Sequence, residues 1–264
     1  MQIQITNPND ERLAPYRDIR ERDLVKNKRH FIAEGKTVLQ VLVAQSRFKL
    51  KSLLILENRL EGLAELILQV PDQIPVYVVS QKIIDSVAGF PMHRGVLAIG
   101  QAPEHIEQIP ENIRSWKRVI VLAGLSNHDN VGSIFRNAAS FDVDAVLIDK
   151  QSCDPLYRKA IRVSVGGVFK VPYFQFETLC AATDWLKENE FETMALSPAG
   201  TTTLSMWKPS QKSAIILGTE GEGLPASSLN NLTTLKVEMS DDFDSLNVAT
   251  TSGIVLHHMA VNQS

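Results

Sequence analysis

Short apolar runs alternate along the chain with segments in which apolar residues recur every three to four positions. The first pattern is typical of buried strands and the second of amphipathic helices. Before residue 102, strands are predicted at 52–56, 76–79 and 96–99, and helices at 36–44, 59–68 and 81–87. This alternation predicts a small α/β domain in the first part of the chain.

Residues 102–112 interrupt the alternation. They contain two prolines and three glutamates without periodicity, so we interpret them as a linker. Beyond them, strands are predicted at 119–122, 145–148, 193–196, 214–217 and 235–237, and helices from 131, at 156–165, at 179–187 and at 248–259. Strands that alternate with helices favour a mostly parallel sheet covered on both faces. We therefore predict two α/β domains, over residues 1–104 and 105–264.

The composition is that of a soluble globular protein, with 44% hydrophobic and 22% charged residues among 264. No apolar run approaches the roughly 18 residues that span a bilayer, and the first residues do not resemble a secretion signal, so we expect a cytoplasmic protein. Cys153 and Cys180 have neither a CxxC partner nor ligand-spaced histidines. We therefore expect no metal site and no disulfide framework.

The net charge of −3 is unevenly distributed. Residues 1–101 carry 14 Lys and Arg against 11 Asp and Glu, and the excess is concentrated between Arg12 and Lys51. A cluster of cations gives sequence-independent affinity for a polyanion, because it displaces counterions from phosphates. A solvated helix face produces the same bias, and composition alone leaves both interpretations open.

The first unusual motif is residues 130–138 (NVGSIFRNA), at a predicted junction between a strand and a helix. Asn130 is expected to cap this helix through its side-chain oxygen. At about 100° per residue, Val131 and Phe135 lie on the core stripe, whereas Arg136 points almost directly away from it. A guanidinium in that position suits a phosphate or a ribose hydroxyl, and a surface ion pair is the alternative.

The second motif is residues 217–224 (LGTEGEGL), whose three glycines permit positive φ and close approach of the backbone to a ligand. It is not a phosphate loop, because it lacks GxGxxG and a Gly-Lys-Ser/Thr sequence. Glu220 and Glu222 would also repel a phosphate. An uncharged or cationic ligand is favoured, and a plain connector between elements is the alternative.

The third motif is residues 245–250 (SLNVAT), which follow the acidic run 241–244. Ser245 is a candidate cap for the last helix, and Asn247 has free hydrogen-bonding capacity beside it. Polar residues where strands give way to helices are typical of ligand sites in α/β proteins. The three motifs together therefore predict one composite site. The chain shows neither a Ser-His-Asp order nor metal-ligand spacing.

In this order and at these separations, the three motifs resemble those of the SpoU (TrmH-like) RNA 2'-O-ribose methyltransferases of the SPOUT class. Residues 31–35 (FIAEG) and 93–96 (HRGV) are similar to the small L30e-like substrate-binding domain of that family. The resemblance implies an α/β trefoil-knot methyltransferase domain over 105–264 and an RNA substrate-binding domain over 1–104. It also implies S-adenosyl-L-methionine as cofactor, structured rRNA or tRNA as substrate, and a homodimer. The separate N-terminal domain favours rRNA, because a folded recognition module can hold a structured stem or loop away from the active site.

The resemblance further implies the site residues. The catalytic set is Arg136, Asn130, Glu220, Ser245 and Asn247. The cofactor-binding set is Leu196, Ser197, Leu217, Gly218, Glu220, Gly221, Met239, Leu246 and Asn247. The RNA-binding set is Lys28, Arg29, Arg94, Arg158, Lys159 and Arg162.

Arg136 is expected to hold a phosphate or to stabilise developing oxyanion character, because a guanidinium with a pKa above about 12 is a poor base. Two departures from the family pattern stand out. Residues 249–252 (ATTS) are more polar than the small-residue run of the family, and His128 with Asp129 replaces a proline-containing lead-in. The alternative to an enzyme is a non-catalytic RNA-binding protein that retains the knotted fold. A Rossmann-type dinucleotide enzyme is disfavoured, because the phosphate fingerprint is missing.

Overall fold

The computed structural model describes residues 2–17, 29–103, 108–219, 223–224, 232–240, 242 and 244–263. Contacts divide the chain into two compact units. The first contains Met1–Glu104 and Pro155–Lys170, and the second contains His105–Asp154 and Val171–Ser264. The first change of unit falls at the predicted boundary after residue 104. The segment 155–170 differs from the prediction, since it packs with the first unit although it lies within the second domain in sequence.

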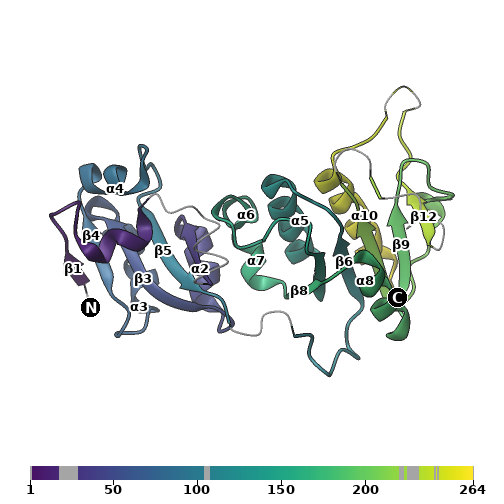
Figure 1. Cartoon of the computed structure of the whole chain (residues 1–264), viewed down its shortest axis with the longest axis horizontal. Coiled ribbons are helices and arrows are strands. Elements are labelled where there is room, and N and C mark those ends of the chain that lie inside the picture. The colour runs from purple at the N-terminus through teal and green to yellow at the C-terminus, as the bar shows by residue number, and fades with distance from the viewer. Residues whose placement is uncertain are drawn as a thin grey trace. The chain divides into compact units, whose positions relative to one another are not determined.

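The first unit is built on a five-stranded sheet in the order β1-β4-β3-β5-β2 (Figure 1). Its strands are β1 (Gln2–Gln4), β2 (His30–Glu34), β3 (Lys49–Leu56), β4 (Val76–Val79) and β5 (Val96–Gln101). Its helices are η1 (Glu11–Tyr16), α2 (Lys36–Ala44), η2 (Glu57–Arg59), η3 (Glu61–Leu63), α3 (Ala64–Leu68), α4 (Gln81–Ala88), α6 (Arg158–Val163) and α7 (Gly167–Lys170). The predicted strands are confirmed within β3, β4 and β5. The single helix predicted over 59–68 is instead three short pieces.

One face of this sheet packs against η1 and α4. Tyr16 of η1 is buried there beside Leu54 and Ile84, and its hydroxyl lies 2.7 Å from the Ser52 hydroxyl. Burial raises the pKa of Tyr16 well above its ordinary value, because the phenolate would be desolvated. This face alone buries thirteen residues in one cluster, so the first unit has a core of its own.

The other face of the sheet holds the segment 155–170 in place. Helix α6 packs on β2, and α7 packs on α2. The Phe169 ring of α7 lies 5.0 Å from Phe31 and 5.2 Å from Phe48, centroid to centroid. Arg158, at the start of α6, donates two hydrogen bonds to Glu34 at the end of β2. These contacts join residues far apart in sequence, which explains why a local pattern did not predict them.

The second unit is built on a seven-stranded sheet (Figure 1), in the order β10-β12-β9-β11-β6-β7-β8, and every pairing between its described strands is parallel. Its strands are β6 (Arg118–Leu122), β7 (Ala145–Asp149), β8 (Tyr173–Phe176), β9 (Glu192–Leu196), β10 (Thr202–Thr203), β11 (Ser213–Leu217) and β12 (Thr233–Lys236). Its helices are α5 (His128–Ser140), α8 (Leu179–Glu188), η4 (Leu204–Met206) and α10 (Val248–Asn262). The predicted parallel sheet is confirmed.

Successive side chains of a strand point to opposite faces, which gives this sheet two apolar surfaces. Val119 and Val121 of β6 pack in a cluster with Leu186 of α8 on one side. Helices α5 and α10 pack against each other and carry a second set of buried residues, including Phe135 and Met259. Because the strands are parallel, the carboxyl ends of β6, β9 and β11 meet at one edge, where the predicted motifs follow them. Within the described residues, no helix is long and apolar enough to cross a membrane.

Candidate functional site

The first motif lies within α5 and not at its start. The helix begins at His128, and its cap is Asn127, whose side-chain oxygen accepts the Asp129 N–H at 2.8 Å. The prediction that Asn130 caps this helix is therefore wrong. Asn130 is instead 7% exposed, and its Oδ1 accepts a hydrogen bond of 2.9 Å from Nδ2 of Asn247. Asparagines at 127 and 130 are equally good caps by residue type, so sequence alone could not choose between them.

The third motif provides the cap of α10. Asn247 Oδ1 accepts the backbone N–H groups of Ala249 at 2.9 Å and Thr250 at 3.3 Å, while its Nδ2 donates to Asn130. The prediction that Ser245 is the cap is wrong, because α10 starts only at Val248. Asn247 thus uses both ends of its amide, one to begin α10 and one to join the third motif to the first.

A cavity of about 480 Å³ lies at this edge of the second unit's sheet. It is lined by the ends of β9 and β11, by β12 and the residues after it, and by the first turn of α10. The predicted site residues that line it are Leu196, Ser197, Leu217, Gly218, Met239, Ser245, Leu246 and Asn247. The second and third motifs, which are far apart in sequence, therefore meet at one cavity, and the first motif reaches them through the bond between Asn130 and Asn247 without lining the cavity. Glu220 and Gly221 lie outside the described residues.

Further lining residues are not in the cofactor-binding set, although Pro198, Thr219 and Asp244 fall in the loops 196–200, 217–221 and 239–247 that the resemblance implies for the cofactor. They are Pro198, Thr219, Gly223, Leu224, Leu235, Val237, Asp244, Val248 and Thr251. Most of them are neighbours in sequence of predicted residues, so their position beside the motifs is the feature by which the sequence could have indicated them. Leu235 and Val237 had only the pattern of a short strand, which does not mark a ligand site.

The wall of the cavity is mostly apolar, with hydroxyl and amide groups placed between the apolar side chains. None of its described lining residues is Lys, Arg or His, so a phosphate finds no cationic side chain there. Gly218 allows the backbone to pack tightly beside it, because a Cβ atom at this position would lie 2.7 Å from the backbone nitrogen of Leu224. These features fit an uncharged or cationic ligand with an apolar part.

Arg136 is exposed on α5, on the side away from the buried stripe, as the helical wheel predicted. It does not line the cavity. Among the residues that the structure describes, no acidic side chain pairs with its guanidinium. The alternative of a surface ion pair therefore has no support in the described part of the chain, and the guanidinium is available to a ligand.

The predicted RNA-binding cations have different environments in the first unit. Arg158 is 21% exposed and paired with the buried carboxylate of Glu34, and its guanidinium lies over the Phe90 ring. Arg94 is half exposed, and its Nε lies 3.9 Å from Oε1 of Glu34. Arg29 donates to the Pro103 carbonyl at 2.8 Å. Arg158 and Arg29 are thus engaged in holding the unit together.

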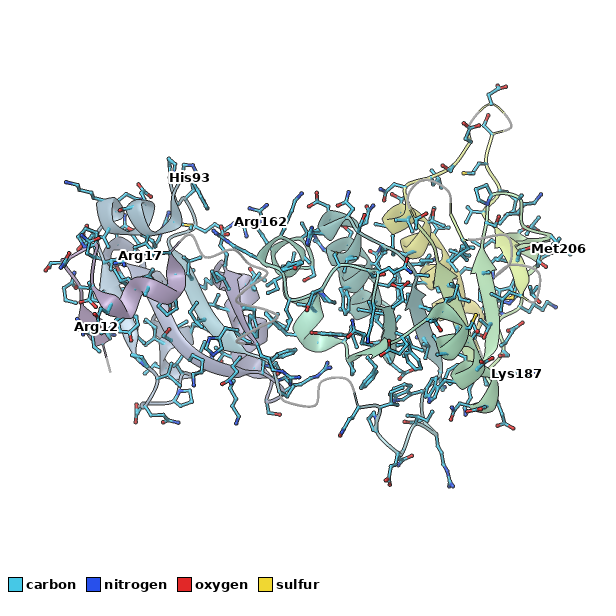
Figure 2. All side chains as sticks on the ribbon, viewed as in Figure 1. Arg12, Arg17, His93, Arg162, Lys187 and Met206 are labelled. Atoms are coloured by element: carbon cyan, nitrogen blue, oxygen red, sulfur yellow. The ribbon has the colours of Figure 1, made fainter. Side chains whose placement is uncertain are left out.

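Two other cations of this set, Lys159 and Arg162, are exposed on α6. Figure 2 shows the side chain of Arg162 projecting from that helix. Lys28 lies outside the described residues. Within the residues described, no group of His, Cys, Asp and Glu could hold a metal ion, and neither Cys153 nor Cys180 is in a disulfide.

Comparison with known proteins identifies the class to which this fold and site belong. Residues 117–257 match the model of the SpoU rRNA methylase family. A relative from Mycobacterium tuberculosis (strain H37Rv), called an uncharacterized tRNA/rRNA methyltransferase, is 36% identical over 269 residues, which cover 96% of this chain and 90% of the relative. The chain therefore belongs to the SpoU rRNA methylase family, a class of RNA methyltransferases. The resemblance seen in the three motifs is confirmed.

Solved structures share the fold over nearly the whole chain. An AdoMet-bound rRNA methyltransferase from Sinorhizobium meliloti superposes with a TM-score of 0.78 at 21% identity, covering 97% of each chain. An RNA 2'-O ribose methyltransferase superposes with a TM-score of 0.81 at 23% identity, covering 99% of this chain and 98% of the other. Both units of the chain, and not only the sheet that carries the cavity, thus have counterparts in these folds.

Proposed function

We propose that this protein uses S-adenosyl-L-methionine to methylate a ribose 2'-hydroxyl in structured RNA. The observation that carries the proposal is the hydrogen bond between Asn130 and Asn247, 2.9 Å long, beside the 480 Å³ cavity. It joins the motif that bears Arg136 to the motif that lines the cavity. A site for a cofactor and a side chain suited to RNA phosphate are therefore held by the same pair of helices.

The chemistry of the cavity fits S-adenosyl-L-methionine. Its volume falls within the roughly 300–1,000 Å³ of small-molecule sites. The apolar side chains of Leu217, Met239 and Leu246 suit an adenine ring, and the hydroxyl and amide groups of Ser197 and Asn247 suit ribose and amino-acid groups. The described lining residues include no cation that would repel a sulfonium. At Gly218 the backbone packs closely against Leu224, which leaves no room for a side chain on this wall of the cavity.

When bound, S-adenosyl-L-methionine supplies a methyl group that its sulfonium makes electrophilic. The residues of this chain must then align a ribose oxygen with that methyl group. We assign this to Arg136, whose planar guanidinium holds the neighbouring phosphate and stabilises negative charge on the attacking oxygen, while the hydroxyl proton passes to a neighbouring acceptor. Asn130 and Asn247 hold α5 and α10 in register for this alignment. Ser245 and Glu220 complete the proposed catalytic set.

The first unit is proposed to bind RNA. Arg94, Lys159 and Arg162 keep exposed charge there, and phosphate contacts of this kind position RNA without reading its sequence. A separate recognition unit suits a structured stem or loop held apart from the reacting nucleotide, which favours rRNA over tRNA. We propose that this reaction takes place in the cytoplasm.

Two features of architecture complete the proposal. The first is a trefoil knot, in which the C-terminal segment threads through a loop of the second unit. The convergence of residues 196–198, 217–219, 244–248 and 251 on one cavity supports it. The second is a homodimer. An open groove of about 700 Å³ runs between α5 and α10, and Ile254 is 38% exposed within it. A second copy of the chain would cover this apolar surface.

Cofactor binding tests the proposal. Thr251→Trp fills the cavity and should abolish binding of S-adenosyl-L-methionine in calorimetry, because Thr251 lines the cavity. Val261→Trp, at an exposed position near the other end of α10, is the matched control and should bind like the wild type. Equal affinity in all three proteins would place the cofactor elsewhere. No binding by the wild type would favour the alternative, a non-catalytic RNA-binding protein.

A further inference from the structure

A second polar contact joins α5 to α10, two helical turns beyond the pair of Asn130 and Asn247. The side-chain nitrogen of Asn137 donates to the carbonyl oxygen of Ala249 at 2.8 Å and to the hydroxyl of Ser252 at 2.9 Å. The Ser252 hydroxyl in turn donates to the same carbonyl at 2.7 Å. The three groups therefore form a closed network between α5 and the start of α10.

This network is buried on its α10 side, partly buried at Asn137, and closely fitted. Ser252 is completely buried, and Ala249 is nearly so. Gly253 leaves room for the asparagine, because a Cβ atom at that position would lie only 3.2 Å from Nδ2 of Asn137. A buried polar group is costly unless it is paired, so each member of the network depends on the others. The polar character of residues 249–252, a departure from the family pattern, thus has a specific partner on α5.

Asn130 and Asn137 are seven residues apart, so they lie on the same face of α5, about 10.5 Å apart along its axis. Asn130 holds the capping residue Asn247, and Asn137 holds the turn that follows it. Two separated attachments fix both the position and the tilt of the start of α10. A single attachment would leave the helix free to pivot about it.

The start of α10 is also a wall of the cavity. Asn247, Val248 and Thr251 line it, whereas Asn137 does not. The Thr251 hydroxyl donates to the Asn247 carbonyl at 3.1 Å, so these lining residues move together with the turn that Asn137 holds. Asn137 therefore acts on a ligand in the cavity through α10 and not by direct contact.

We propose that Asn137 is a positioning residue for the cofactor: through Ala249 and Ser252 it sets the first turn of α10 against α5 and thereby shapes the wall of the cavity. The inference rests on the proposed function for the identity of the ligand. It assigns no chemical step to Asn137, which touches neither the cavity nor the guanidinium of Arg136 in the described contacts.

Asn137→Asp is the direct test, since it keeps the size of the side chain but replaces the donor with oxygen that repels the Ala249 carbonyl. Binding of S-adenosyl-L-methionine in calorimetry should weaken by about tenfold. Hydrogen exchange of the amides in the first turn of α10 should accelerate, with exchange in the rest of the helix unchanged. Asn189→Asp is the matched control. Asn189 also donates a 2.8 Å side-chain bond to a backbone carbonyl, but at the end of α8. It should leave affinity within about twofold of the wild type.

Ser252→Ala provides a second variant if Asn137→Asp does not fold. It removes both bonds of the Ser252 hydroxyl and keeps the bond from Asn137 to Ala249, so affinity should fall by less, about threefold. Light scattering of each variant shows whether the state of association has changed, which separates an effect on α10 from an effect on assembly.

Unchanged affinity and unchanged exchange in Asn137→Asp would overturn the inference. A lower stability with wild-type affinity and exchange would make Asn137 a purely structural residue, and would also overturn it. If the wild type itself binds no S-adenosyl-L-methionine, the proposed cofactor is wrong; the exchange data then decide alone whether Asn137 holds the start of α10.

Discussion

Arg158→Ala should destabilise the first unit, although Arg158 was predicted to contact RNA. The side chain donates through Nε at 3.1 Å and Nη2 at 2.9 Å to one carboxylate oxygen of Glu34. The Glu34 side chain is only 6% exposed. Removal of the guanidinium leaves a buried carboxylate with its main partner lost, in a contact that attaches α6 to β2.

The size of the effect follows from burial. Loss of one partner from a fully buried ion pair costs about 3–5 kcal/mol. Here Arg158 is 21% exposed, and the Nε atom of Arg94 remains 3.9 Å from the other oxygen of Glu34. Solvent and Arg94 compensate part of the loss, so we expect the free energy of unfolding to fall by about 2–3 kcal/mol.

Urea unfolding of the full chain can assign this loss to the correct unit. The three tryptophans, Trp116, Trp185 and Trp207, all belong to the second unit, so their fluorescence reports on that unit alone. Far-ultraviolet circular dichroism reports on both units. Arg158→Ala should shift the transition seen by circular dichroism to lower urea and leave the fluorescence transition in place.

A matched control is the exposed ion pair of Lys150 and Glu177, whose side chains are 55% and 73% exposed. Lys150→Ala should change stability by less than about 0.5 kcal/mol. The double variant Glu34→Leu with Arg158→Met replaces both charges with apolar groups and should recover most of the loss. The reasoning is refuted if Arg158→Ala is as stable as Lys150→Ala while RNA affinity falls, since Arg158 would then be a free RNA contact.

Three further predictions follow from other contacts. Gly100→Ala should cost about 3 kcal/mol in urea unfolding, because the added Cβ would lie 2.1 Å from the Phe31 ring; a smaller loss in a Phe31→Leu background checks the cause. The pKa of Tyr16 is higher in the folded state than in the unfolded state. The stability linked to this difference is therefore fully present below pH about 10, where the phenol is neutral in both states, and it is lost as the pH rises further. Stability should therefore fall more steeply above pH about 10 in the wild type than in Tyr16→Phe, and parallel curves would contradict this. Asn247→Asp keeps the oxygen that caps α10 but loses the bond to Asn130, so the rate of methyl transfer should fall while the melting temperature remains that of the wild type. Asn247→Ala loses the cap as well as this bond, so it should also lose about 1 kcal/mol of stability.

The elements of the sheets were predictable because their signal is local. The continuous apolar runs of β6, β7 and β11 are fully or almost fully buried strands, as their composition predicts for a parallel sheet. The parallel arrangement in turn brings the ends of distant strands together. The convergence of the second and third motifs on one cavity could therefore be predicted without knowledge of any contact.

The caps and the attachment of α6 could not be predicted in the same way. Two asparagines near the start of α5, and Ser245 and Asn247 before α10, are all good caps, so residue type does not select among them. Tertiary structure determines which residues become the caps, because Asn130 and Asn247 are placed to form a hydrogen bond with each other. Arg158 likewise reads as a surface cation in sequence, because its partner Glu34 is 124 residues away.

Transfer of radiolabelled methyl from S-adenosyl-L-methionine to total RNA, taken from a strain that lacks this gene, tests the proposed activity most directly. We expect the wild type to label one nucleotide of one RNA species. The phosphodiester bond that follows this nucleotide should then resist alkaline cleavage, since a methylated 2'-oxygen cannot attack the phosphate. Arg136→Ala should abolish the label while binding of S-adenosyl-L-methionine is retained, because Arg136 does not line the cavity. Label on a base, with cleavage unaffected, or full activity in Arg136→Ala would contradict ribose methylation by this site.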